Sequence, residues 1–248
     1  GVKHIIAVAS GKGGVGKSYI NFLLVQYYLK LGAKVQGFDT DPVNHTLGSF
    51  EALPIEIVQL GERQDKINPR YFDYLVEKIL AMPEDGVCVV DNGSSTFLPL
   101  LGYLVESQVL ELLREAGHEI RLHAVLAGGQ AVNDTMTGFS QILTYLPDVP
   151  VVVWLNQYFG RIERRLPKGG VQTFEETKLY KDNKDRIFSL VRLPEVNPET
   201  FGHDIAQMMQ AHLSFAEAVA SEDFALMARQ RLKKTWETLY EAIVEAKL

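Results

Sequence analysis

The sequence predicts an α/β fold in which a mainly parallel β-sheet is flanked by helices on both faces. The first observation is that short apolar runs, typical of buried strands, alternate with helical patterns along the chain. The second is that the first run leads directly into a glycine-rich loop followed by a helix. The third is that 248 residues, 46% of them hydrophobic, are enough for one substantial core. We therefore expect a single domain over residues 1–248.

The expected strands are apolar runs, and the expected helices end where glycine or proline interrupts their pattern. The strands are expected at 5–9, 35–38, 87–90, 122–127, 151–155 and 187–193. The helices and their stops are 16–31 before Gly32, 69–81 before Pro83, about 99–116 before Gly117, and 130–146 before Pro147. Two or more helices after Pro198 would form a C-terminal helical region at about 198–248.

Charge and composition exclude several classes of protein. A formal net charge of −6 gives no electrostatic basis for a surface that binds nucleic acid throughout, although a local basic patch is compatible with it. The single cysteine, Cys88, lies in an apolar run, which excludes a disulfide framework and fits a reducing cytoplasm. No apolar stretch has the length of a membrane span, and no signal segment opens the chain. We expect a cytoplasmic protein without a membrane span.

The loop after the first strand has the composition of a phosphate-binding loop. From Gly11 to Ser18 it fits the spacing G-x-x-x-x-G-K-[ST], with a strand before it and a helix after it. Glycines let backbone N–H groups turn toward one anion, Lys17 supplies a charge for the β- and γ-phosphates, and the Ser18 hydroxyl is a ligand for Mg²⁺. This predicts a P-loop NTPase fold. The expected nucleotide contacts in the loop are Gly11, Lys12, Gly13, Gly14, Val15, Gly16, Lys17 and Ser18.

Small, acidic or amide residues follow the other strands, where ligands of open parallel sheets bind. They are Asp39-Thr40-Asp41-Pro42, Asp91-Asn92-Gly93, Gly128-Gly129-Gln130, Asn156-Gln157 and Pro194-Glu195. We interpret Asp91 as the acid near Mg²⁺, usually through a bound water. Asp41 is the candidate that orients the hydrolytic water and contacts the metal shell. Asp39 is expected to accept hydrogen bonds from backbone N–H groups at its turn.

These residues resemble the deviant Walker A ATPases of the ParA/MinD group. The resemblance rests on Lys12-Gly13-Gly14-Val15-Gly16-Lys17-Ser18, on Asp39-Thr40-Asp41-Pro42 and on Asp91. It implies that Lys12 is a signature lysine that reaches the partner's phosphates in an ATP-dependent homodimer. It further implies ATP and Mg²⁺ as cofactors, Asp41 as the water-positioning residue, Asp91 as the Walker B acid, and Asn156 with the backbone near Pro194 as adenine contacts.

Within that group the chain resembles the TraL proteins of conjugative plasmids over nearly its whole length. The similar phrases include Asp39-Thr40-Asp41-Pro42-Val43-Asn44, Gly128-Gly129-Gln130, Val152-Val153-Trp154-Leu155-Asn156 and Arg229-Gln230-Arg231-Leu232. The resemblance implies a role in plasmid transfer. The chain departs from the partition ATPases in two switch segments, which follow Asp41 and Asp91. In the first, Val43-Asn44 follows Pro42, where partition ATPases have Gln-Gly-Asn. In the second, Asp91-Asn92-Gly93-Ser94 lacks the usual Asp-x-x-Pro. The iron–sulfur branch is excluded because it needs two cysteines per subunit.

Two other functions remain open from the sequence. One is a nucleotide-dependent scaffold with little hydrolysis, which the altered switches favour. The other is a ligase similar to dethiobiotin synthetase, against which Lys12 argues because those enzymes lack the Lys-Gly-Gly opening of the loop. Two basic clusters could contact DNA phosphates, although such clusters are usually solvated. They are Arg161, Arg164, Arg165 and Lys168, and Arg229, Arg231, Lys233 and Lys234. The last helix is expected to fold against the core rather than to target a membrane.

Overall fold

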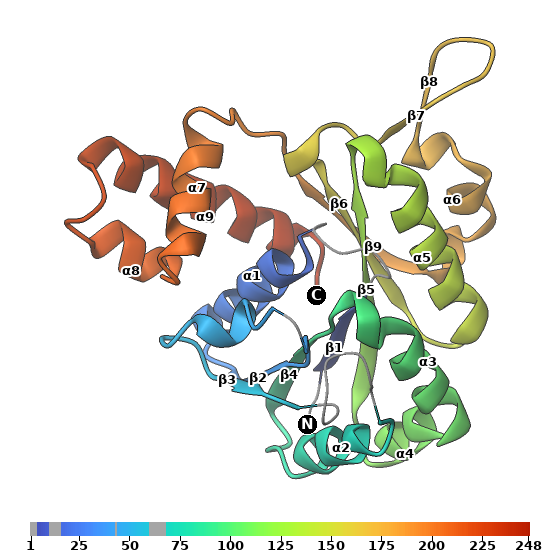
Figure 1. The fold of residues 1–248 in the computed structure, drawn as a ribbon. Coiled ribbons are helices and arrows are strands. Elements are labelled where there is room, and N and C mark those ends of the chain that lie inside the picture. Colours follow the sequence, from blue (N-terminus) through green and yellow to red (C-terminus); the bar gives the residue numbers. More distant parts are fainter. Residues whose placement is uncertain (1–3, 10–15, 43, 60–67) are drawn as a thin grey trace.

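A parallel sheet forms the centre of the molecule (Figure 1). The structure is a computed structural model that describes residues 4–9, 16–42, 44–59 and 68–248. In that part of the chain the sheet has seven strands in the order β3-β2-β4-β1-β5-β6-β9, and every neighbouring pair is parallel. The strands are β1 (His4–Ala9), β2 (Lys34–Asp39), β3 (Ile55–Ile57), β4 (Gly86–Asp91), β5 (Glu119–Ala127), β6 (Val151–Asn156) and β9 (Ile187–Leu193).

Helices cover both faces of this sheet, as predicted. They are α1 (Lys17–Lys30), α2 (Tyr71–Leu80), α3 (Phe97–Glu106), α4 (Val109–Glu115), α5 (Val132–Tyr145), α6 (Lys178–Asp182), α7 (Phe201–Gln210), α8 (Phe215–Ala220) and α9 (Leu226–Glu245). All six expected strands are present within a few residues of their predicted bounds. The helices expected at 16–31, 69–81 and 130–146 are also confirmed. The α/β fold class is therefore the observed one.

The single helix expected at about 99–116 is wrong, because the structure has two helices there. α3 ends at Glu106 and α4 begins at Val109, and the pair is bent by 64°. Gln108 precedes α4 with φ 51°, a left-handed backbone conformation that cannot continue an α-helix. Among the described residues no single helix is long and apolar enough to span a membrane. In that part of the chain only this bent pair has the required length and apolar composition when its two helices are taken together.

The three shortest strands of the described chain were not predicted from the sequence. β3 is a three-residue edge strand, and β7 (Glu163–Arg165) pairs antiparallel with β8 (Val171–Thr173) in a separate hairpin. The hairpin projects beyond the sheet near α6 (Figure 1). Segments of this length give no periodic pattern that separates them from loops.

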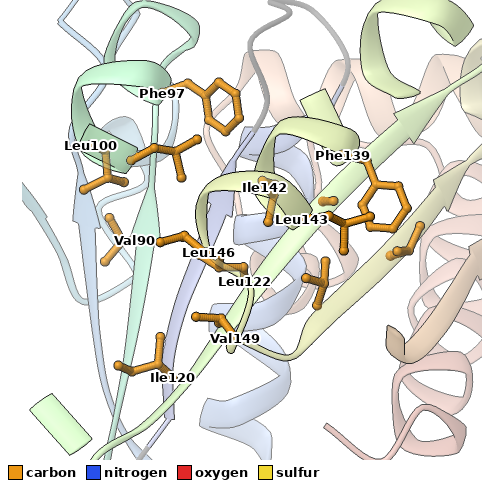
Figure 2. Packing of buried hydrophobic residues seen from close by; sticks show 14 of the residues in the cluster. Val90, Phe97, Leu100, Ile120, Leu122, Phe139, Ile142, Leu143, Leu146 and Val149 are labelled. Carbon is orange, nitrogen blue, oxygen red and sulfur yellow. The ribbon is translucent and has the colours of Figure 1, made fainter. Parts of the chain in front are cut away.

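The strands β4, β5 and β6 each bury side chains on both faces of the sheet. On β6, Val153 and Leu155 pack in the core beneath α2, α3, α4 and α5, while Val152 and Trp154 pack in the core beneath α1, α7 and α9. Figure 2 shows part of the first core, with Phe139 and Ile142 of α5 lying against the sheet. Because parallel strands are covered on both sides, their sequences are nearly continuous apolar runs. These continuous apolar runs are the reason that the strands could be predicted from the sequence.

The C-terminal helix α9 packs on the α1 side of the sheet. Its residues Leu232, Leu239 and Ile243 are buried in the same core as α1. Arg231 of α9 also pairs with the buried carboxylate of Asp204 on α7. The expectation that the last helix folds against the core is therefore confirmed.

Candidate functional site

The carboxyl ends of β2, β4 and β6 bring the predicted site residues to one edge of the sheet. Asp39 and Asp91 are paired in register at the ends of β2 and β4. Asn156 ends β6, and Lys17 begins α1 close to them. The predicted contacts at 11–15, Lys12 included, lie outside the described residues. Parallel topology therefore collects residues from distant parts of the chain at the place where α1 begins.

Asp91 lies at the centre of a buried hydrogen-bond network with the start of α1. The Ser18 hydroxyl donates to Asp91 Oδ2 at 2.9 Å, and Asn21 Nδ2 donates to Asp91 Oδ1 at 3.0 Å. The same amide group also donates to the Lys17 carbonyl at 3.0 Å. The Thr40 hydroxyl donates to the Asp91 carbonyl at 2.7 Å. The Asp91 side chain is thereby fixed beside the Ser18 hydroxyl.

Lys17 is held in the same site with little access to water. Its exposed fraction is 7%, and burial lowers the pKa of its ammonium group. The negative charges of Asp91 and Asp41 act in the opposite direction and raise this pKa. An ammonium group that has already lost its hydration interacts strongly with an incoming anion. Lys17 therefore has the surroundings expected of a phosphate-binding lysine.

Burial raises the pKa of the Asp91 carboxyl to about 7. The charges of Asp39 and Asp41 contribute to this raised pKa, whereas the hydrogen bond from Ser18 and the charge of Lys17 oppose it. The carboxyl group is therefore easily protonated when no cation lies beside it. A cation at this position favours the ionised carboxylate and lowers the pKa.

We expect the pH dependence of stability to report this carboxyl group. Its pKa rises from 3.8 to about 7 on folding, so between these values the native state binds more protons than the unfolded state. Its stabilising contribution is complete below pH 3.8 and is lost as the pH rises through 7. The variant Asp91→Asn should therefore gain stability relative to the parent protein as the pH rises from 4 to 7, by at most about 1.4 kcal/mol per unit. Urea unfolding without metal or nucleotide measures the difference. A constant difference across this range would contradict the shift.

Asp39 fixes the turn that carries Asp41. Its Oδ1 accepts from the Asp41 N–H at 3.0 Å and its Oδ2 from the Gly48 N–H at 2.8 Å. This confirms the expectation that Asp39 binds backbone donors. Asp41 Oδ1 in turn accepts from the Asn44 N–H at 3.1 Å. The two acids therefore differ in their surroundings, since Asp39 is fully buried and Asp41 lies partly exposed at the edge.

Gly93, after β4, approaches Asp41 so closely that any side chain would collide with it. A Cβ atom on Gly93 would lie 2.9 Å from Asp41 Cγ and 3.1 Å from Asp41 Cα. We expect Gly93→Ala to displace Asp41 and to lower nucleotide turnover by about 10-fold or more. The matched control is Gly102→Ala, whose Cβ would meet nothing within 4 Å. Steady-state phosphate release measures both, and equal rates would show that the position of Asp41 is unimportant.

A cavity of about 300 Å³ adjoins the end of β6. Asn156 and Pro194 both line it, so the structure brings together the two predicted base contacts. Tyr19 and Tyr158 also line the cavity, and Thr238 of α9 contributes to its wall. Asn156 is 1% exposed, and its Oδ1 accepts from the Tyr158 N–H at 3.1 Å. The cavity has the size and the mainly apolar walls that suit a nucleobase.

Gly16 connects this cavity to the start of α1. Its φ is 95°, and a Cβ there would lie 2.5 Å from Asn156 Nδ2. A side chain at Gly16 is therefore excluded both by backbone conformation and by space. The close approach places the proposed phosphate and base contacts next to each other.

The comparison with known proteins agrees with this geometry. The model of the CobQ/CobB/MinD/ParA nucleotide binding domain matches residues 6–244. The chain belongs to this family. Two proteins of Escherichia coli named TraL are similar to it, one 42% identical over 95% of each chain and the other 43% identical over 91% of each chain. The predicted resemblance to the ParA/MinD group and to TraL proteins is thus confirmed.

Solved structures with the same fold include the MinC:MinD cell division protein complex of Aquifex aeolicus. That chain has a TM-score of 0.52 and 16% sequence identity, with 96% of each chain covered. At this identity the similarity supports the fold alone. The family fold explains why the nucleotide-binding edge lies at the carboxyl ends of the strands.

The oxygen donors at the carboxyl ends of the strands fit Mg²⁺. The Ser18 hydroxyl and the Asp91 carboxylate are hard oxygen donors 2.9 Å apart. Mg²⁺ usually binds through one or two protein groups, several waters and phosphate oxygens, rather than in an all-protein cage. In the described part of the chain no group of three or more His, Cys, Asp or Glu side chains could hold a metal.

Sequence reasoning missed several residues that hold this site together. Asn21 is fully buried and links Asp91 to Lys17, and Thr40 holds the backbone of Asp91. Asn21 carried one signal, because a polar residue one turn after Lys17 interrupts an otherwise apolar run of α1. The sequence around Thr238 gives no such signal, because the position of Thr238 in the cavity wall depends on how α9 packs.

The two basic clusters have different surroundings. In the first, Arg161 pairs with Glu195 at 2.8 Å and Arg164 donates to Gln172 at 2.8 Å. In the second, Arg231 forms an ion pair with Asp204, while Lys233 and Lys234 are exposed. Contact with DNA stays a prediction for both clusters.

Proposed function

We propose that the protein binds and hydrolyses Mg-ATP, alternates between a monomer and an ATP-bound sandwich dimer, and acts in conjugative plasmid DNA transfer. The observation that carries the proposal is the fixed group of Lys17, Ser18 and Asp91, in which the Ser18 hydroxyl lies 2.9 Å from the Asp91 carboxylate. This is the arrangement required to bind a nucleotide phosphate and its metal at one point.

Each residue of the group has a part in the proposed mechanism. Lys17 would bind the β- and γ-phosphates, and Ser18 and Asp91 would hold Mg²⁺, partly through water. When bound, Mg²⁺ would neutralise charge on the phosphate oxygens. Asp41 would contribute to holding the metal and would orient the water that attacks the γ-phosphorus. Most of the rate enhancement would come from positioning and charge stabilisation.

The cavity at Asn156 is the proposed site of the adenine base. Asn156 and Pro194 line the cavity, where the Asn156 amide and the backbone beside Pro194 are the polar groups next to the proposed base. The mainly apolar walls would cover the faces of the ring. Residues 11–15 are proposed to supply the remaining contacts with the phosphates.

The biological setting is proposed from the TraL relatives, which are similar over almost the whole chain. Proteins of the conjugative transfer apparatus, or the DNA itself, are the partners that this setting suggests. The family membership accounts for the nucleotide site and not for the partner.

We expect Lys12→Ala to abolish ATP-dependent dimerisation while some nucleotide binding remains. The proposed role of Lys12 is to contact the phosphates bound by the other subunit, so its loss removes the interaction between subunits and not the pocket. Sedimentation velocity with and without ATP measures the change. Dimers that form equally well in the variant would show that Lys12 has no role between subunits.

A nucleotide-dependent scaffold with little hydrolysis is the second candidate function. It is favoured by the hydrogen bond of Asp41 Oδ1 with the Asn44 N–H, which engages the side chain that would orient water. Phosphate release measured with and without DNA separates the two functions. A single turnover or less per bound ATP under both conditions would favour the scaffold.

A further inference from the structure

An open groove of about 710 Å³ lies between the end of α1, α8 and the middle of α9. It shares no lining residue with the cavity at Asn156. Leu29, Val219 and Trp236 are the large apolar lining residues that are at least partly exposed, and Leu53 and Phe215 are buried beneath them. Figure 1 shows α8 and α9 side by side at the end of the molecule where α1 also lies. The nucleotide site uses none of these side chains.

The walls of the groove are fixed by contacts between the three helices. Gln26 Oε1 accepts from the Phe215 N–H at 2.9 Å, and Gln26 Nε2 donates to the Phe22 carbonyl at 3.0 Å. Ser214 and Glu217 form a capping box at the start of α8. The rings of Phe215 and Trp236 are stacked with centroids 5.2 Å apart. The groove is therefore already formed, which reduces the entropy lost when a ligand binds.

The charged side chains that line the groove are Lys30 and Lys233. Both are exposed, and no described carboxylate lies within ion-pair distance of either ammonium group. Lys30 Nζ lies 4.0 Å from the centre of the Tyr240 ring, which holds its charge at the rim. The chain as a whole has a formal charge of −6. The local charge of the groove is thus opposite to that of the molecule.

We propose that this groove binds an acidic amphipathic helix of a partner protein. Apolar side chains of the helix would lie over Leu29, Val219 and Trp236, and its carboxylates would reach Lys30 and Lys233. A half-buried tryptophan in an apolar hollow is typical of the residues that dominate interface energies. A membrane surface fits less well, because a hollow between helices cannot insert into a bilayer as a projecting apolar face does.

Panning phage that display random 16-residue peptides on the full-length, nucleotide-free protein tests the proposal. We expect enrichment of peptides that combine carboxylates with bulky apolar residues at helical spacing. Fluorescence anisotropy of labelled synthetic peptides then gives the affinity. Lys30→Glu/Lys233→Glu should weaken binding about 10-fold or more, and added salt should weaken it too. Because no nucleotide is present, the result is independent of the proposed ATPase activity.

The matched control is Lys168→Glu/Lys178→Glu, which makes the same charge change at exposed lysines outside the groove. We expect peptide affinity to be unchanged in this variant. Trp236→Ala should also weaken binding, and the charge variants test the idea even if that variant unfolds. Enriched peptides without acidic residues, or equal affinity for both double variants, would overturn the proposal. Binding to anionic vesicles that is lost in Lys30→Glu/Lys233→Glu would overturn it in favour of a membrane surface.

Discussion

Replacing Lys17 with alanine is expected to lower ATP affinity by at least about 100-fold, so that binding is no longer measurable at micromolar nucleotide. Lys17 is 7% exposed and lies at the start of α1, where the charge of Asp91 acts on its ammonium group. Its interaction with phosphate oxygens would therefore be weakly screened. Its removal also leaves the carboxylates of Asp91 and Asp41 to repel the phosphates. Isothermal titration calorimetry with Mg-ATP measures the loss.

The control for this variant is Lys34→Ala. Lys34 begins β2 at the other end of the sheet and pairs with Asp85 at 3.2 Å, and both side chains are largely exposed. Such a pair contributes at most about 1 kcal/mol to stability, and its loss should leave nucleotide binding unchanged. Thermal unfolding checks that Lys17→Ala still folds. Unchanged ATP affinity in folded Lys17→Ala would show that the phosphates bind elsewhere.

The sheet was predictable because its central strands are buried on both faces. On β6 every side chain from Val151 to Asn156 is buried, so the run is apolar almost without interruption. The break between α3 and α4 was not predictable, because both helices carry buried apolar side chains and the sequence pattern does not change at Gln108. Only the left-handed backbone of Gln108 separates the two helices. Local hydrophobic pattern carries no information on such a bend.

The candidate site was predictable where a motif or a strand end specifies a residue. Lys17, Ser18 and Asp91 follow from the loop pattern and the end of β4, and the structure brings them together. The support around them was not predictable, because it depends on contacts between distant segments. Asn21 and Asp91 are 70 residues apart, and the contact of Gly93 with Asp41 exists only when two strands end side by side. Tertiary packing, not local sequence, determines these contacts.

Asp41→Ala is expected to lower ATP turnover by at least about 100-fold while ATP binding is retained. Asp41 carries negative charge close to Lys17, whereas the Asp91 carboxylate accepts hydrogen bonds from Ser18 and Asn21. Removing this charge leaves Lys17, Ser18 and Asp91 in place and reduces repulsion of the γ-phosphate. ATP-bound dimers should therefore accumulate. Phosphate release and sedimentation with ATP measure the two effects.

Asp41→Asn separates the charge of this side chain from its position. An asparagine oxygen can still accept from the Asn44 N–H, which is 3.1 Å from Asp41 Oδ1, so the turn keeps its anchor. The amide is neutral and is a poor proton acceptor, so it cannot replace a carboxylate as a base toward water. If charge on Asp41 drives hydrolysis, the asparagine and alanine variants should be equally slow. Near-normal turnover in Asp41→Asn with loss in Asp41→Ala would instead assign Asp41 to holding the turn. Normal turnover in both variants would remove Asp41 from the mechanism and direct attention to the residues that follow Asp91.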